Sequence, residues 1–569
     1  MKNIIILILL NIFYILSYSQ ENRINVEDVY CNVDTFNMMI LINQNVEEIN
    51  DTIPIRKIQV LDDDYFFSFP ETELETGVSY DVFNIQNEEY KLYFTQLPIV
   101  NLHTNNTIVD EPRVSAHFSL CETNENYIES DIGIEIRGGS SKSHPKKSFR
   151  IEFLDDTINK KTVDVSLLGM RSDDDWNLQA MYNEPLRLRS KVNFALWDKI
   201  DNLYYMRQEP SANNGIEQEY IELFLNDEYQ GIYTLSERID RKQLQLKKNK
   251  GSYLRGELYK GVSWGASTYT SIPNFNNTNE LWSGFKYEYP SDTTIWDNLY
   301  EYIDFVINDD SLSFYPKYTE KLCLENAVNY FIFLNTLRAT DNTGKNLYLA
   351  RYNTNEPYFF VPWDLDGTFG TIWNGSKVNI TNDILTNGLY NRLLLDTKSD
   401  GFKYSLNRRW KELRENTITV DSILSMFNSE FDYLTKNGAY KRELEVWKEC
   451  TFIDMNNLDY TKSWLEDRLN FLDKEWGDSS TFTGIGNIQV ATESPIVFPN
   501  PTSNYLKFQS SRKVIKISIF NNIGVIQKNT YPEDSSGTIE IHNLNSGLYI
   551  AVFKLDSGES KVTRFIINE

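Results

Sequence analysis

Hydrophobic and polar residues alternate in different ways along successive parts of the chain. In residues 20–97, short apolar runs such as Met38–Ile42 and Tyr90–Phe94 are separated by turns rich in Asp, Asn, Gly and Pro. Short runs between such turns are typical of β-strands. We therefore expect a small β domain at residues 20–97.

The pattern becomes mixed in residues 98–476. Strand-like runs at Ile132–Ile136, Ser148–Phe153 and Ile221–Leu225 alternate with runs of helical periodicity. The expected helices cover Leu188–Ile200, Glu320–Leu337, Asn407–Arg414 and Tyr460–Trp476. Interspersed strands and helices of these lengths predict an α+β domain.

A change of composition separates this domain from the end of the chain. Residues 477–494 are rich in Ser, Thr and Gly, which is typical of a linker. Strand-like runs then return, among them Val514–Phe520 and Leu544–Phe553. Several short strands in one short segment predict an immunoglobulin-like β-sandwich at residues 495–569.

The first residues have the pattern of a secretory signal peptide. Lys2 gives a positive start, an apolar run covers Ile4–Leu16, and the small residues Ser17 and Ser19 form a cleavage-like site. An uncleaved membrane anchor is the alternative, but the apolar run is shorter than the roughly 20 residues that span a bilayer. We expect removal of residues 1–19 and no transmembrane span in the mature chain.

Composition narrows the classes of partner and site. Hydrophobic residues make up 41% of the 569 residues and charged residues 24%, as in ordinary globular proteins. The 81 acidic residues outnumber the 56 Lys and Arg residues, and the net charge of −25 argues against a nucleic-acid partner. Four Cys without a CxxC pair, together with four His, argue against a disulfide scaffold and a zinc site.

A polar loop with Asp341 and Asn346 follows the expected helix at Glu320–Leu337. It leads into two strand-like runs, Asn346–Tyr352 and Tyr358–Pro362. A hairpin of these runs would place the loop beside the turn that holds Asp364 and Asp366. These two carboxylates are two positions apart and share one face if the strand stays extended there.

Three carboxylates and one amide at the end of a strand suit a divalent metal ion such as Mg²⁺ or Mn²⁺. Their order is that of a protein kinase active site: a loop Asp, an Asn five residues later, a hairpin, and a metal-binding Asp near a Gly. The alternative is a set of acids that cap turns at strand ends.

A loop of small residues upstream offers positive charge. It begins at Arg137, contains Ser140 and Ser141, and is closed by Lys146 and Lys147. Gly and Ser let backbone N–H groups approach phosphate oxygens, and Lys adds charge. Alternation along the next strand puts the two lysines on opposite faces. We place the phosphate contact at Lys147, with Lys146 as the alternative, and a solvated hairpin tip as the non-functional reading.

Five longer motifs occur in order between residues 97 and 476. They are RGGSSKSHPKKSFRIEF, DDDWNLQAMYNEPLRLRSKVNFALWD, ELFLNDEYQGIYTLSERID, YLRGELYKG and NLYLARY…FFVPWDLDGTFG. This region resembles the CotH kinase family, the spore coat protein H-like atypical protein kinases. The resemblance implies a distorted, atypical protein-kinase-like core that uses ATP and a divalent metal ion to phosphorylate Ser or Thr of proteins.

The resemblance also implies roles for individual residues. Asp341 would be the catalytic base, Asn346 and Asp364 would be metal ligands, and Asp366 a possible helper. The basic loop from Arg137 to Lys147 would hold the phosphates.

Four further residues match family motifs outside this group. Arg189 would pair with an acid or a phosphate, and Glu237 would either orient the phosphate lysine or form a salt bridge at a strand end. Tyr259 and Lys260 would flank the base. The family tends to have Asp five residues before the helix Arg, where this chain has Glu184, which keeps the charge on a longer side chain.

The end of the chain resembles the C-terminal sorting domain of the type IX secretion system of Bacteroidota. FPNP, KISIFNNIG and LNSGLYI carry this resemblance, in that order. It implies Sec export followed by recognition by the type IX machinery, and hence a secreted or cell-surface protein. An ordinary terminal binding module is the alternative.

These expectations describe an exported protein kinase that transfers the γ-phosphate of ATP to Ser or Thr of a secreted or surface protein rich in these residues. ATP is scarce outside the cytoplasm, and a fold can persist without its activity. A catalytically silent surface adhesin or structural protein on a kinase-like scaffold is therefore the alternative.

Overall fold

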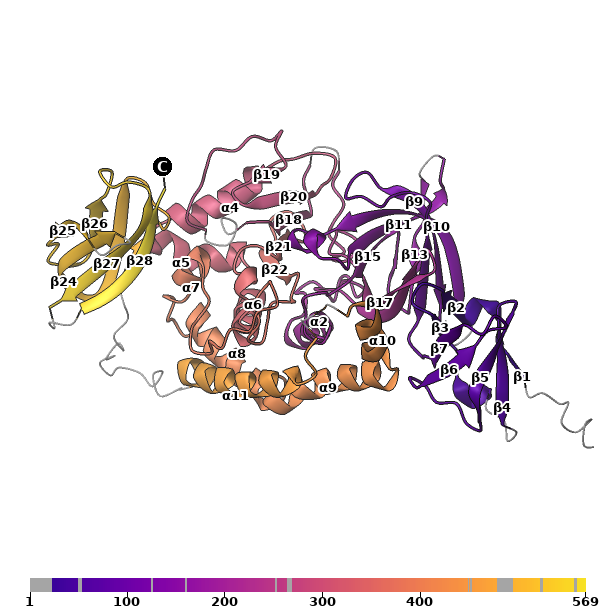
Figure 1. Ribbon diagram of the computed structural model, residues 1–569. Coiled ribbons are helices and arrows are strands. Elements are labelled where there is room, and N and C mark those ends of the chain that lie inside the picture. The colour runs from indigo at the N-terminus through magenta and orange to yellow at the C-terminus, as the bar shows by residue number, and fades with distance from the viewer. Residues whose placement is uncertain are drawn as a thin grey trace, which may run out of the picture.

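The computed structural model describes residues 23–49, 54–123, 126–158, 161–250, 253–263, 269–448, 450, 453–477, 495–521, 525–556 and 560–568. The expected signal peptide and residues 478–494 of the expected linker lie outside the described residues. Figure 1 shows the N-terminal strands at one end of an elongated molecule, a large mixed region in the middle and the C-terminal strands at the other end.

The N-terminal strands form one seven-stranded sheet in the order β1-β4-β5-β6-β7-β3-β2. They are β1 (Arg23–Asn25), β2 (Cys31–Asp34), β3 (Met39–Ile42), β4 (Ile55–Val60), β5 (Asp63–Glu71), β6 (Ser79–Phe83) and β7 (Glu89–Phe94). Alternating residues such as Ile58, Val82 and Leu92 are buried in its core. Single helical turns cover Asp28–Tyr30 and Val46–Glu48.

An eight-stranded sheet follows. Its order is β10-β9-β8-β16-β17-β15-β11-β12, and β10 also pairs with β11, so that seven of its strands close into a barrel-like ring. The strands are β8 (Ile99–His103), β9 (Val114–Cys121), β10 (Tyr127–Arg137), β11 (Ser148–Asp156), β12 (Lys161–Thr162), β15 (Asp175–Gln179), β16 (Gln218–Leu225) and β17 (Glu228–Ser236). The short strands β13 (Val165–Ser166) and β14 (Ser172–Asp173) pair beside it.

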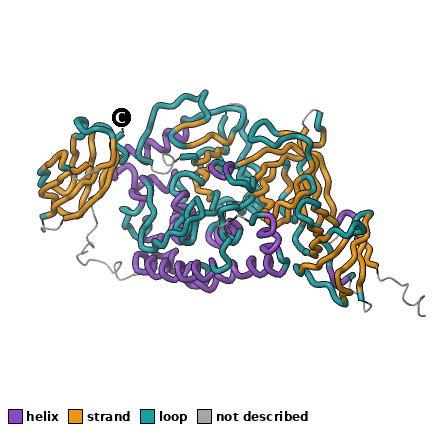
Figure 2. Tube along the Cα trace, viewed as in Figure 1, coloured by secondary structure: helices purple, strands orange, loops and turns teal. Residues whose placement is uncertain are grey.

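A five-stranded sheet with several helices around it completes the middle region (Figures 1 and 2). Its order is β19-β20-β18-β21-β22, formed by β18 (Glu257–Gly261), β19 (Leu281–Trp282), β20 (Phe285–Tyr289), β21 (Leu347–Arg351) and β22 (Tyr358–Pro362). The helices are α2 (Arg189–Ile200), α4 (Asp297–Asn308), α5 (Ser311–Lys321), α6 (Leu324–Leu337), α7 (Gly388–Leu393), α8 (Phe402–Asn416), α9 (Val420–Lys436), α10 (Ala439–Val446) and α11 (Asn457–Trp476).

The helix expected at Glu320–Leu337 is two helices. α5 ends at Lys321 and α6 begins at Leu324. Between them the N–H of Cys323 donates a hydrogen bond to the carbonyl oxygen of Tyr358 at 2.8 Å. The chain therefore leaves helical geometry for two residues to join strand β22.

The C-terminal strands form a separate sheet in which β24 pairs with four others (Figure 1). They are β23 (Ile496–Phe498), β24 (Tyr505–Asn521), β25 (Ile526–Thr530), β26 (Asp534–Glu540), β27 (Gly547–Leu555) and β28 (Ser560–Ile567). Phe508, Ile517, Phe553 and Phe565 belong to a hydrophobic core made of residues of this segment.

Two further features concern the whole chain. All four cysteines are free thiols, and Cys31 and Cys121 are buried in the same core cluster as the N-terminal strands. Within the described ranges, no helix combines the length and the apolar character that a membrane span requires.

Candidate active site

A cavity of about 600 Å³ is lined by residues of both the eight-stranded and the five-stranded sheet. The first sheet contributes the end of β10, the loop after it, and the end of β15. The second contributes β18, β20, and the segments just before β21 and just after β22. The lining is mostly polar and carries both acidic and basic side chains.

The β21–β22 hairpin brings the acidic segments together. Leu347 of β21 faces Pro362 of β22, and the N–H of Trp363 donates to the carbonyl oxygen of Asn346 at 3.1 Å. The buried side chain of Asn342 donates to the carbonyl oxygens of both Asn346 and Trp363, at 2.8 and 2.7 Å. The loop before the hairpin and the turn after it are thereby fixed to each other.

All four residues of the expected acidic group line the cavity. They are Asp341, Asn346, Asp364 and Asp366. The Asn346 amide donates to Asp341 Oδ2 at 2.9 Å, so that the two side chains are held in contact. The Asp341 carboxylate is also 3.0 Å from the Lys345 ammonium group.

Burial and mutual repulsion disfavour the charged forms of these acids. Burial raises the pKa of Asp341, and the charge of Asp364 raises it further, against the effect of Lys345. Burial, followed by the charge of Asp364, raises the pKa of Asp366 well above its usual range. A cation among these carboxylates would relieve both effects.

The alternation argument supposed that Asp364 and Asp366 lie on an extended strand, but they lie in a turn after β22. β22 ends at Pro362, and Asp364 has a left-handed backbone with φ of 55°. Asp364 is exposed and Asp366 is partly buried, yet the turn directs both to the cavity lining.

Lys146 reaches the cavity, whereas Lys147 is not among the residues that line it. β11 begins at Ser148, so that the strand alternation does not extend to either lysine. The Lys147 ammonium group donates to the carbonyl oxygen of Lys142 at 2.6 Å, back toward the loop. The cavity lining thus favours Lys146, the alternative, over Lys147, and the choice of the lysine that contacts a phosphate stays a prediction.

Lys146 is buried in an ionic cluster. Its ammonium group lies 2.8 Å from Glu443 Oε1, donates to the carbonyl oxygen of Ile232 at 2.6 Å and lies 4.6 Å from the ring centre of Tyr233. Glu443 also accepts from the guanidinium of Arg187 at 3.0 Å. Burial lowers the pKa of Lys146 to about 8, although Glu443 acts in the opposite direction.

The loop of small residues also lines the cavity. Arg137, Gly138, Gly139, Ser140 and Ser141 all belong to the lining. A single helical turn, η3 (Ser140–Ser143), follows the glycines. Apart from Gly139 and its two chain neighbours, no described residue has a heavy atom within 4 Å of the position that a Cβ at Gly139 would take, so that the backbone there is open to a ligand.

Arg137 and Lys260 flank one aromatic side chain of the cavity. They lie 5.8 and 5.7 Å from the ring centre of Trp363, and Lys260 also lies 5.6 Å from that of Tyr348. Burial lowers the pKa of both cations.

Besides Lys147, three expected site residues are not part of the cavity lining. Arg189 is buried and pairs with Glu184 at 2.7 Å, so that the longer acid of this chain still reaches the arginine. Glu237 accepts from the backbone N–H groups of Arg171 and Glu217 rather than from a lysine of the cavity. Tyr259 is fully buried among aromatic rings.

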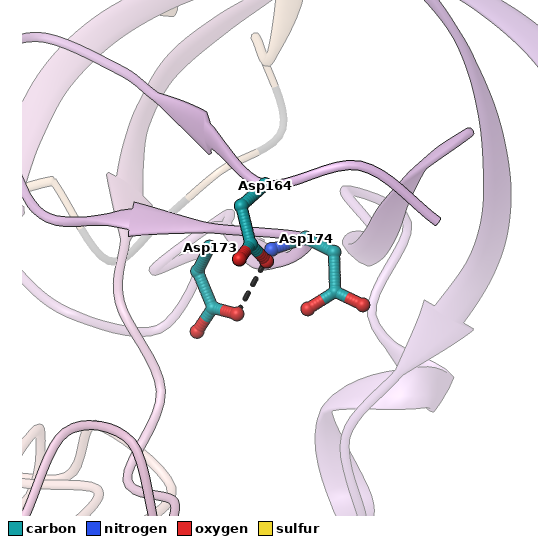
Figure 3. A group of neighbouring side chains, drawn as sticks. All are labelled: Asp164, Asp173 and Asp174. Carbon is teal, nitrogen blue, oxygen red and sulfur yellow. Dashed lines mark hydrogen bonds between the residues drawn. The ribbon is translucent and has the colours of Figure 1, made fainter. Parts of the chain in front are cut away.

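Sequence reasoning missed Glu443, because it lies 297 positions from Lys146 on α10 and no motif marks it. It also missed a cluster of Asp164, Asp173 and Asp174, which Figure 3 shows with their carboxylates close together. The ammonium group of Lys242 lies 3.0 Å from each of the three. This lysine therefore already compensates part of the negative charge of the cluster.

Comparisons with known proteins place most of the chain in families. The family described as CotH kinase protein matches residues 134–472, more than half of the chain. The family described as secretion system C-terminal sorting domain matches residues 496–568. A search of curated proteins finds no match.

Two solved structures resemble short parts of the chain. One is PorZ, an essential bacterial surface component of the type IX secretion system of Porphyromonas gingivalis, with 17% identity, 13% of this chain and 11% of that chain covered, and a TM-score of 0.12. The other is CopC from Methylosinus trichosporium OB3b, with 12% identity, 13% and 90% covered, and a TM-score of 0.11. The chain thus spans about a tenth of the PorZ structure, and such TM-scores carry no argument. The family matches do: the chain belongs to the CotH kinase protein family and ends in a type IX sorting domain.

Proposed function

We propose that the protein is an exported, metal-dependent protein kinase that transfers the γ-phosphate of ATP to Ser or Thr of a secreted or surface protein. The observation that carries the proposal is the cavity, whose lining combines three mutually repelling carboxylates, a buried lysine and an open loop of small residues. CotH family membership and the sorting domain support the activity and the export route.

The donor set fits a hard divalent cation. Asp364 and Asp366, with the amide oxygen of Asn346, would hold Mg²⁺ or Mn²⁺, since these ions prefer oxygen ligands. When bound, the ion would neutralise charge on the phosphates of ATP. Both the raised pKa of Asp366 and the exposure of Asp364 are consistent with a cation in this place.

The other residues would position the two substrates. Asp341, held by the Asn346 amide, would accept or orient the proton of the attacking hydroxyl group. Lys146 would contact a phosphate group, and Glu443 fixes the position of its ammonium group. The backbone of Gly138, Gly139 and Ser140 would approach the phosphates, with the charge of Arg137 beside it.

We further propose that the middle region is a kinase-like core at residues 98–476, that the C-terminal strands form an immunoglobulin-like sandwich, and that residues 1–19 are a Sec signal. These assignments rest on the family matches and on the sequence patterns. They lead to a cell-surface or secreted protein handled by the type IX machinery.

Two variants test the proposed chemistry. Asp364→Asn should abolish or weaken metal-dependent ATP binding, measured by titration calorimetry with Mg²⁺ and with Mn²⁺. Asp341→Asn should leave that binding intact and lower phosphate transfer to a Ser-rich protein by about 10²–10⁴-fold, the scale of a positioned acid–base group. Asp467→Asn, a change on the exposed face of α11, is the matched control. If the wild-type chain binds no nucleotide with either metal, the kinase proposal fails and the silent adhesin remains.

A further inference from the structure

Lys260 and Lys286 lie next to each other in the cavity lining. In the pairing of β18 with β20, Lys260 is directly opposite Lys286, and in the pairing of β18 with β21 it is opposite Tyr348. All three residues line the cavity. The five-stranded sheet therefore presents a row with two adjacent positive charges to the cavity.

Like charges directly opposite each other destabilise a sheet unless an anion compensates them. Glu288 lies 3.3 Å from Lys286 and compensates that lysine in part. Among the described residues, no carboxylate lies within ion-pair distance of Lys260 or Arg137, although the charge of Asp364 acts on both cations and that of Glu288 on Lys260. Both cations lie against the Trp363 ring. The row thus has an excess of positive charge where it faces the cavity.

The row of Lys260 and Lys286 lies on the same side of the cavity as Asp341. The N–H of Asn346 donates to the carbonyl oxygen of Gly261 at 3.2 Å, which joins the strand of Lys260 to the loop of Asp341. Lys345 adds a third lysine on this side, 3.0 Å from Asp341. The proposed phosphate-binding elements, Lys146 and the glycine loop, come instead from the other sheet.

We propose that Lys260 and Lys286 bind an anionic side chain of the protein acceptor, next to the Ser or Thr that reaches Asp341. The acceptor is then an acidic segment, and the binding group is a carboxylate or the phosphate of an already phosphorylated residue. This proposal rests on the proposed kinase function, because Asp341 defines the acceptor side of the cavity.

Direct binding tests the proposal without relying on turnover. Three fluorescent peptides would be titrated with the full chain: a Ser flanked by Glu, the same Ser flanked by phosphoserine, and the same Ser flanked by Lys. We expect the acidic peptides to bind about tenfold or more tightly than the Lys peptide, with an affinity that falls as salt rises. The first two peptides distinguish the carboxylate from the phosphate.

Variants of the two lysines test whether these side chains cause the preference for acidic peptides. Lys286→Met and the double variant with Lys260→Met should each weaken binding of the acidic peptides about five- to tenfold, and they should remove the preference over the Lys peptide. Lys462→Met, on the exposed surface of α11, should change nothing. Equal binding of all three peptides would overturn the proposal.

A nucleotide titration separates this proposal from the proposed function. If Lys286→Met weakens ATP binding but not peptide binding, the row serves the nucleotide, and the acceptor proposal is wrong while the kinase proposal stands. If the acidic peptides bind through the row and no nucleotide binds, the kinase function fails and the acidic-segment site remains. Folding of each variant would be checked by its thermal melting curve.

Discussion

Lys146 illustrates how a single residue of the cavity depends on distant parts of the chain. Its ammonium group, Glu443 and Arg187 form a cluster in which every side chain is fully buried. The Glu443 carboxylate also accepts from the N–H of Ile232 at 2.7 Å. Burial of charges is costly unless they are paired and hydrogen-bonded, and here each has several partners.

Replacing Lys146 with Met should therefore lower the free energy of unfolding by about 3 kcal/mol, because Glu443 stays buried with one cation fewer. Lys147→Met removes only a hydrogen bond to a carbonyl group and should cost about 1 kcal/mol or less. Urea titrations of the two variants make the comparison. Equal losses would contradict the assignment of Lys146 to the buried cluster.

Asp201 is a second buried ionisable residue, and it lines another cavity. Its carboxylate accepts from the amides of Asn326 at 2.9 Å, Asn329 at 2.8 Å and Asn214. Burial nevertheless raises its pKa to about 6. The pKa of this carboxyl in the unfolded chain is about 3.9. At a pH between the two pKa values, the folded protein therefore holds a proton here that the unfolded chain has released.

This difference predicts a pH dependence of stability. As the pH falls from 8 to 5, the Asp201 carboxyl should add on the order of 1 kcal/mol to the stability of the wild type, because the folded form takes up the proton first. The same stability is lost as the pH rises through 6. Asp201→Asn should lack this dependence. Denaturant titrations at both pH values, compared between the two proteins, measure it, and parallel changes in both would refute it.

At the scale of elements, the sequence pattern predicts the β21–β22 hairpin, but it does not predict which of Lys146 and Lys147 lines the cavity. Two apolar runs separated by a polar turn are a local signal, and the runs expected at Asn346–Tyr352 and Tyr358–Pro362 correspond to β21 and β22. The choice between Lys146 and Lys147 depended on where β11 begins, and strand ends are set by tertiary contacts that the pattern does not contain. Glu443 left no local signal, because its partners lie in other elements.

The contact of α10 with β17 explains how Glu443 reaches the cavity lysine. Gly231 of β17 has φ of 89°, and a Cβ on it would lie 2.0 Å from Glu443 Oε2. The helix can approach the strand this closely only because a glycine occupies that position.

Gly231→Ala should lower the free energy of unfolding by about 3 kcal/mol, since backbone strain and the clash with Glu443 add together. Gly169→Ala is a matched control, because Gly169 also has a positive φ, of 78°, but no described residue other than its chain neighbours lies within 4 Å of its Cβ position. That variant should lose only about 1 kcal/mol. Chemical denaturation of both variants checks the difference, which should vanish if α10 does not need this close approach.

At the scale of the whole molecule, the two ends of the chain are attached differently. The N-terminal sheet shares a hydrophobic cluster with the eight-stranded sheet. This cluster contains Met39 and Tyr93 of the first sheet and Ile99, Phe224 and Tyr229 of the second. The C-terminal sheet has a core composed of its own residues. We therefore expect the first to depend on its neighbour and the second to fold by itself.

Removal of residues 478–569 should consequently leave the Tm of the remaining chain unchanged, because no part of its main core is lost. In the native host, the shortened protein should accumulate inside the outer membrane, since it has lost the sorting domain. Calorimetry and cell fractionation measure the two effects. Normal secretion of the shortened chain would show that the segment is not an address.

The free cysteines have a consequence for how the chain matures. Burial raises the pKa of Cys31 and Cys121 to about 12, so that both thiols stay protonated and react slowly with oxidants. The described fold therefore contains no disulfide, and its assembly does not wait for a redox step. Production of the protein in a reducing cytoplasm should yield the same native molecule, with a melting temperature that added dithiothreitol does not change.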